Sequence, residues 1–168
     1  MDLHEDAPAH QADTEDIAIQ GFPDHLTLRQ AIALHRARLG DVAVGLAPSG
    51  TAEESALFDG HDAIHALYDC DTDLVGESMA DTWTLSGTTM TVRRYLTYLR
   101  QPAVRALVAD LGAWPLLRGI VLAMPCVWRA WWRGRAQASL WDFDAWSSHL
   151  DETLGQLRTT HGIRPVDR

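Results

Sequence analysis

Apolar residues recur every three to four positions along most of this 168-residue chain, which is the spacing of one face of an α-helix. In segment 26–39, for example, Leu28 and Ile32 lie on one stripe, and Thr27 precedes them as a candidate N-cap. The same pattern predicts helices over 53–68, 74–85, 91–99, 102–111, 115–132 and 141–159. Strand signals are weak, and the β-branched stretch 82–92 is the main alternative to a helix. The pattern therefore predicts an all-α fold.

The first 25 residues depart from this pattern. They contain seven Asp and Glu side chains, no Lys or Arg, and little apolar periodicity. Such a segment cannot bury enough apolar surface to offset the entropy lost on ordering. We therefore expect a flexible, disordered acidic tail over residues 1–25. Residues 26–168 should form a single helical domain, which is long enough to bury a sizeable core.

The most apolar stretch, 119–128, is bounded by Arg118 and Arg129 and interrupted by Pro125. A bilayer-spanning helix needs about 20 apolar residues, so this stretch is too short to span, and the proline should kink or end its helix. Three interpretations of segment 114–132 stay open: a buried core helix, the wall of a pocket, and a helix that faces a membrane. Tryptophan and arginine side chains near it have the amphipathic chemistry of a membrane interface. They are Trp128, Trp131, Trp132, Trp141, Arg129, Arg133 and Arg135.

Charge is unevenly distributed along the chain. The formal net charge is −9, yet segment 93–135 holds eight arginines and a single acid, Asp110. This basic segment is either a set of solvated helix faces or a surface for anionic lipid headgroups or a phosphorylated or carboxylated ligand. Nucleic acid is not expected as a partner, because the whole chain is acidic and carries no recognised binding motif. No basic-then-apolar leader opens the chain, which predicts a cytoplasmic protein, either free or peripheral on the inner face of the cell membrane.

Four residues have the chemistry and spacing of a metal site. His61 and His65 are four apart and share a helix face, and Asp62 falls in the same sector. Glu77 follows eleven residues later, beyond a polar turn that would let a second helix run back antiparallel. Imidazole and carboxylate groups are ligands for divalent metals, zinc above all. The sequence thus predicts a metal site between two adjacent helices with ligands His61, Asp62, His65 and Glu77, although Asp62 could instead orient a histidine from behind.

The turn between these two helices adds further candidates. Asp73 is a candidate N-cap for the second helix. Cys70 could supply a fifth ligand, but a small buried residue is the plainer interpretation. Cys70 and Cys126 form no C-x-x-C pair, so a disulfide stays open and a reduced, intracellular setting is favoured.

The spacing His61-Asp62-x-x-His65-(eleven residues)-Glu77 resembles the signature of the coenzyme Q biosynthesis protein 4 family. Segment 72–77 resembles the loop and helix start that carry the family's glutamate. Weaker matches to the family's closing segment lie at 131–135, 144–146 and 150–163. The resemblance covers roughly residues 55 to 165. The chain is shorter than family members usually are, and their longer helical N-terminal half has little counterpart before residue 50.

The resemblance implies a metal-dependent lyase of ubiquinone or related biosynthesis. It would decarboxylate, oxidatively, a hydroxybenzoate-type quinone precursor that carries a polyprenyl or other hydrophobic group. Zinc is the first guess for the metal, with Asp62 and Glu77 as catalytic residues. The partners implied are a membrane surface, other quinone biosynthesis proteins or a second copy of the chain.

Three alternatives remain beside that activity. The protein could be a non-catalytic, lipid-binding scaffold in which the metal is structural. It could be a tailoring enzyme that acts on a different small molecule in secondary metabolism. A phosphohydrolase built on His35, His61 and Asp62 is the third, and it leaves His65 and Glu77 without roles. The sequence holds no nucleotide-binding glycine loop, no Ser/His/Asp order and no flavin fingerprint.

Overall fold

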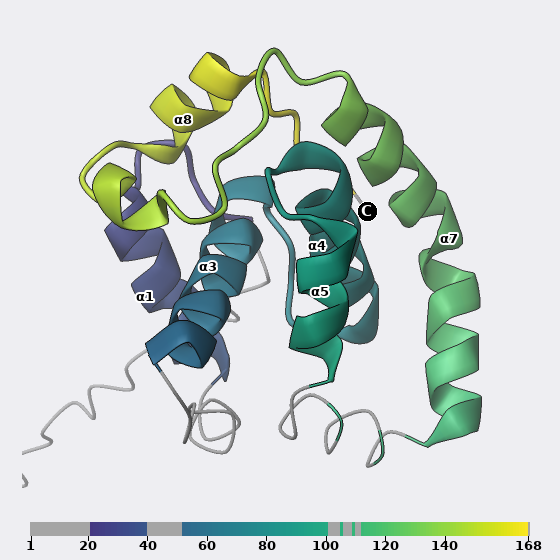
Figure 1. Cartoon of the computed structure of the whole chain (residues 1–168). Helices are drawn as coiled ribbons and strands as arrows, with labels where there is room; N and C mark the ends of the chain where they lie inside the picture. The colour runs from purple at the N-terminus through teal and green to yellow at the C-terminus, as the bar shows by residue number, and fades with distance from the viewer. Residues whose placement is uncertain (1–20, 40–51, 101–104, 106–108, 110–111, 168) are drawn as a thin grey trace, which may run out of the picture.

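The computed structural model describes residues 21–39, 52–100, 105, 109 and 112–167, and within them the fold is all-α, as predicted (Figure 1). Its elements are α1 (Leu28–Leu39), α3 (Ala52–Tyr68), α4 (Leu74–Gly87), α5 (Val92–Leu99), α7 (Ala113–Arg135), the 3₁₀ helix η1 (Trp146–His149) and α8 (Leu154–His161). Helix α4 runs through most of stretch 82–92, so the strand alternative is wrong there. Within the described residues the only β-type pairing is two isolated bridges.

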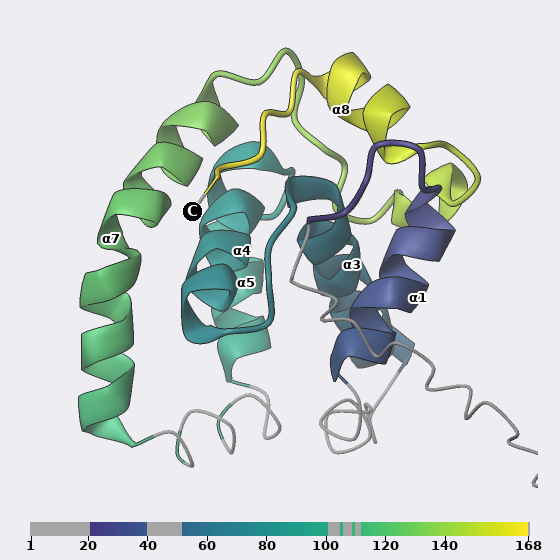
Figure 2. The ribbon, with the colours of Figure 1, turned by 180° about the vertical axis from the view of Figure 1, so that it is seen from behind.

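Four of the helices form a row in which each packs on the next. Helix α1 contacts α3, α3 contacts α4, and α4 contacts α7 over the longest of these interfaces. Helix α8 lies against the end of α3, at the top of the views in Figures 1 and 2. Both views place α7 at the outer edge of the molecule, so one side of α7 meets α4 and no other described helix lies beside its outer side.

A tight reversal places α3 and α4 side by side. Asp69 adopts a left-handed conformation with φ 58°, and the Cys70 amide donates to the His65 carbonyl, 2.9 Å away, at the end of α3. Asp73 then caps α4 as predicted, because its side chain accepts a hydrogen bond of 2.7 Å from the Gly76 amide. The turn therefore brings the first turn of α4 back beside the last turns of α3.

The core fills the space between these helices and the loop that follows α7. Tyr68 and Trp83 stack with ring centroids 4.5 Å apart, and the Tyr68 hydroxyl donates to the Gly87 carbonyl at 3.0 Å. Trp141 and Ile64 are also almost fully buried. Burying side chains of this size stabilises a fold by about 1.5–3 kcal/mol each, so this cluster fixes α3 against α4.

The segment after α7 differs from the predicted helix over 141–159. The Trp141 amide donates to the Gly87 carbonyl and its carbonyl accepts from the Thr89 amide, both at 2.9 Å, which holds Trp141 extended against the end of α4. After the short 3₁₀ helix η1, an α-helix begins only at α8, behind a capping box formed by Thr153 and Gln156. Backbone pairing with a distant segment therefore replaced the helix that local periodicity favoured.

The domain begins earlier than residue 26. Phe22 is only 3% exposed, and its amide donates to the Asp69 carboxylate at 2.6 Å. Arg158 of α8 donates to the Phe22 carbonyl at 3.0 Å and to the Asp24 carboxylate at 2.7 Å. The last five residues of the predicted tail thus belong to the folded domain. Residues 1–20 lie outside the described residues, as does the predicted helix 102–111 apart from helical positions 105 and 109.

Helix α7 packs on α4 through small residues. A Cβ atom added at Gly119 would collide with the Leu74 side chain, and one at Gly134 would collide with Ser86, so the two helices approach too closely for larger residues. The helix continues through Pro125, which is exposed, so of the two predicted effects, a kink or an end of the helix, the end is wrong. Within the described residues, no helix combines the length and apolar character needed to cross a membrane.

Candidate metal centre

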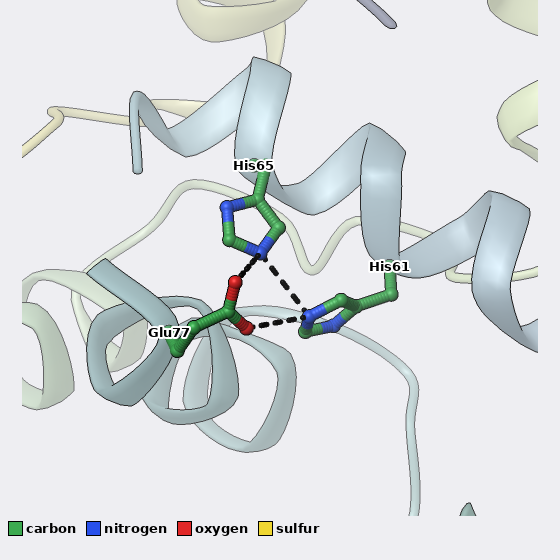
Figure 3. Close-up of side chains that lie close together, drawn as sticks. All are labelled: His61, His65 and Glu77. Carbon is green, nitrogen blue, oxygen red and sulfur yellow. Dashed lines mark hydrogen bonds and ion pairs between the residues drawn. The ribbon is translucent and has the colours of Figure 1, made fainter. Parts of the chain in front are cut away.

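Three of the four predicted ligands converge between α3 and α4. Figure 3 shows His61 and His65, on α3, pointing towards Glu77 in the first turn of α4. The Nε2 atoms of the two histidines are 3.1 Å apart. The distances to the Glu77 carboxylate are 3.3 Å from His61 and 3.4 Å from His65. A single ligand atom from each residue lies within 4.8 Å of the others, which makes this group able to hold a metal ion.

These separations match the geometry of a zinc ligand set. Nitrogen and oxygen ligands lie about 2.0–2.1 Å from a tetrahedral zinc ion, so neighbouring ligand atoms are about 3.3 Å apart. The His61–His65 distance is 3.1 Å, and each histidine lies 3.3 or 3.4 Å from a different oxygen of Glu77, so each pair of residues is spaced like two zinc ligands. With a single oxygen taken from Glu77, the three ligand atoms lie within 4.8 Å of one another. A cation held between the rings would be coordinated by their Nε2 lone pairs.

The turn between the helices orients His65 for this role. His65 is 1% exposed, and its Nδ1 atom lies 3.1 Å from the Cys70 carbonyl oxygen. Because a carbonyl only accepts, Nδ1 must carry the proton, which leaves the Nε2 lone pair directed at the group. The Cys70 sulfur instead lies 3.7 Å from the Tyr68 carbonyl, so the backbone of Cys70, and not its thiol, serves the site. Neither Cys70 nor Cys126 forms a disulfide.

Charge and burial reinforce one another at the group. Burial alone would raise the pKa of Glu77, but hydrogen bonds and positive charge from the protonated forms of His61 and His65 hold that pKa well below its usual range. Burial alone would lower the pKa of His61, but the hydrogen bond and charge of Glu77 raise it above its usual value. Glu77 keeps 38% of its side chain exposed, whereas the histidines are buried. The group is therefore closed on the α3 side and open on the side of the carboxylate.

The structure leaves Asp62, the fourth predicted ligand, out of this group. Its carboxylate accepts a hydrogen bond of 2.6 Å from Arg36 and lies 3.5 Å from the Nε2 atom of His35, both on α1. A step of one residue turns a side chain by about 100° around a helix, which here directs Asp62 to α1 and His61 to α4. Burial would raise the pKa of Asp62, but these partners lower it. Asp62 ties α1 to α3 and does not contribute a ligand.

His35 packs against the ring of His65 and so helps to hold it in place. Its ring stacks on His65 with centroids 4.4 Å apart and an interplanar angle of 23°, and it is 2% exposed. Burial and the neighbouring histidines lower the pKa of His35, which keeps the ring uncharged against its neighbour. The sequence placed His35 on the buried stripe of α1, but its contact with His65 joins residues thirty apart that no local pattern connects.

Asp81 is a site residue that the sequence reasoning missed. It lies four residues after Glu77, so the two carboxylates share a face of α4, and that spacing was a usable signal. Burial raises the pKa of Asp81, with a contribution from the Glu77 charge, while its hydrogen bond with Tyr95 opposes the change. A small, largely apolar cavity adjoins His61, with room for about one water molecule. Its lining is Leu57, His61, Thr84, Met90, Tyr95 and Phe143.

No protein-family model matches the chain, and no curated protein or solved structure matches it either. The resemblance to the coenzyme Q biosynthesis protein 4 family therefore stays a prediction that rests on the His/Asp/His/Glu spacing. The functional argument is carried by the residues themselves.

Proposed function

We propose that the protein binds a divalent metal ion, zinc first, through His61, His65 and Glu77, and decarboxylates a carboxylated aromatic precursor of the quinone type. The observation that carries this proposal is the convergence of the His61, His65 and Glu77 side chains, in which each pair of residues approaches to 3.1–3.4 Å and one side is open. Structural zinc sites are closed by four protein ligands, whereas catalytic sites keep three and leave a position for water or substrate. The three-ligand arrangement supports a catalytic role over a purely structural one.

A metal held here would act as a Lewis acid towards a substrate carboxylate or phenolate oxygen. The residues around the metal would donate a proton, orient a ligand and keep a ligand ionised. Asp81, whose pKa is raised by burial, is the candidate proton donor, because a proton must replace the carboxylate on the ring when decarboxylation is not oxidative. His35 and the Cys70 carbonyl keep the His65 ring in one orientation. Glu77 stays ionised, so it remains a ligand across the neutral pH range.

An aromatic substrate would enter beside His61. The cavity there is lined mostly by apolar and aromatic side chains, which suits a flat ring, but it is too small to hold one. Entry therefore requires movement of the Met90 and Tyr95 side chains, which lie at and near the start of α5. A phosphohydrolase based on His35 and Asp62 is not supported, because Asp62 is engaged by Arg36 and His35 packs on a ligand.

The test is metal content followed by activity. Protein purified without chelator should carry about one divalent ion per chain. His65→Ala should lose it, and His25→Ala, at an exposed position outside the site, should keep it. Because His65 is buried and its loss could unfold the chain, Glu77→Gln provides a second variant of nearly unchanged volume. Wild-type protein that carries no metal and takes up none on titration would refute the metal centre.

The same Glu77→Gln variant separates enzyme from scaffold. If the metal is catalytic, the variant should lose turnover of a prenylated hydroxybenzoate but still fold, with the melting temperature of chelator-treated wild-type protein. If the metal is structural, both the variant and chelator-treated wild-type protein should lack a cooperative melting transition, because metal binding is then part of the folding free energy. A wild-type protein that binds metal but converts no carboxylated aromatic would leave the scaffold role in its place.

A further inference from the structure

The outer face of α7 exposes far more apolar surface than any other described part of the molecule. Nine of the thirteen exposed large apolar side chains belong to this helix. Six of them are more than half exposed, namely Trp114, Leu117, Val121, Leu122, Trp128 and Trp132. Single exposed apolar residues are ordinary, but a contiguous apolar patch on a protein surface marks an interaction site.

The exposed side chains lie on one side of α7. With a turn of about 100° per residue, all of the nine except Leu122 fall within an arc of about 120°. The opposite side is buried against α4 and is made of small residues, Gly119, Ala123, Ala130 and Gly134. Among the residues that the structure describes, nothing covers the outer arc, because α7 packs on α4 through its other side, and Figures 1 and 2 both show α7 at the edge of the molecule.

The charged residues of α7 indicate which kind of partner would bind to this face. The helix holds four arginines and no Asp or Glu. Arg118 and Arg129 are exposed and fall directly beside the apolar arc, while Arg133 is engaged with the carbonyls of Arg164 and Pro165. A second copy of this helix would bring arginine against arginine without a carboxylate to pair them. An anionic surface would be complementary to it.

We propose that the outer face of α7 docks on a membrane surface that contains anionic lipids. The helix is 23 residues long, or about 34 Å, and it carries tryptophans along its apolar side with arginines at the edge of that side. Tryptophan and arginine combine an apolar body with a polar end, which suits them to the boundary between headgroups and acyl chains. Helix α7 lies in the plane of that boundary, with its small-residue side still packed on α4.

Vesicle sedimentation of the full chain tests this docking. Binding to phosphatidylcholine vesicles that contain about 30% phosphatidylglycerol should exceed binding to phosphatidylcholine alone, and it should weaken as salt screens the exposed arginines. Trp128→Gln combined with Trp132→Gln should lower binding by at least about tenfold. Leu34→Gln, an exposed apolar site on α1, is the matched control and should leave binding unchanged.

A second pair of variants isolates the charge. Arg118→Gln combined with Arg129→Gln should lower the preference for anionic vesicles by roughly tenfold, because each exposed arginine adds its own attraction to the anionic lipid surface. Arg29→Gln on α1, which is also exposed, should not. Equal and negligible sedimentation of wild-type protein with both vesicle types would overturn the proposal. A wild-type dimer that binds no vesicles and becomes monomeric in the double tryptophan variant would overturn it in favour of a second copy.

Discussion

Folded proteins usually bury apolar side chains and expose ionisable ones. The candidate metal centre and the outer face of α7 are opposite exceptions to this rule. At the metal centre, ionisable groups are buried between α3 and α4. On α7, tryptophans and aliphatic side chains are exposed. Both arrangements are costly for an isolated folded chain, because the first desolvates charge and the second leaves apolar surface in water. Each cost would be relieved by a proposed partner, a cation in one case and a lipid surface in the other.

The two regions meet at α4, which faces the centre with its first turn and supports α7 through a separate side. Because the two surfaces are distinct, changes at one should leave the other intact. Three measurements would sharpen or break this contrast.

The largest effect should come from metal itself. Free zinc at about 100 to 1,000 times its dissociation constant should stabilise the wild-type chain by about 2.7 to 4.1 kcal/mol, since only the folded chain presents the three ligands together. Chemical denaturation with and without zinc measures this directly. In His61→Ala, zinc should raise the free energy of unfolding by almost nothing. Each protein is compared with itself, with and without zinc, so the cost of the substitution itself cancels. Equal stabilisation of both proteins would place the zinc elsewhere.

A smaller effect should distinguish the two sides of α7. Gly119→Leu would force a side chain into Leu74 and should lower the free energy of unfolding by roughly 1–3 kcal/mol. The neighbouring Ile120, 45% exposed, provides the control, since Ile120→Gln should change the free energy of unfolding by less than about 0.5 kcal/mol. Urea denaturation measures both. A large loss in Ile120→Gln would mean that the outer face is covered within the folded chain.

The smallest effect on the free energy of unfolding concerns Asp62, which follows His61 in the sequence. The pKa of Asp62 is lower in the folded chain than its ordinary value of 3.8, so its contribution to stability is complete above that pH and is lost as the pH falls below it. Asp62→Asn should therefore cost about 1 kcal/mol near neutral pH, and the difference from wild type should shrink below pH ~4. Melting curves across that range test this. Asp151→Asn, in an exposed pair with Arg29, should cost almost nothing at any pH.

The sequence predicted those parts of the site that depend on local geometry. The pair His61 and His65 follows from helix periodicity, and the polar turn indicated the return that brings Glu77 beside them. Asp62 was misplaced because its real partners, His35 and Arg36, lie on α1, and no local pattern says which helix packs on which. Residues that share a sector of one helix can still face different neighbours.

Long-range contacts also explain where the fold prediction failed. The helix expected from residue 141 gave way to backbone pairing between Trp141 and the end of α4, more than fifty residues earlier. For α7, the apolar composition was evident, but whether that surface is buried depends on how many sides other helices cover. Only the small residues at Gly119 and Gly134 hinted that one side packs closely and the other does not.

The position of Arg158 has a consequence for how the site comes into existence. Its guanidinium donates to the carbonyls of Ala66 and Leu67, which lie in the final turn of α3 and have no helical partner of their own. It also holds Phe22 and Asp24 at the other end of the chain. A residue of α8 thus completes the helix that carries both histidines. The two candidate ligands on α3 are therefore fully supported only after a contact across more than ninety residues has formed.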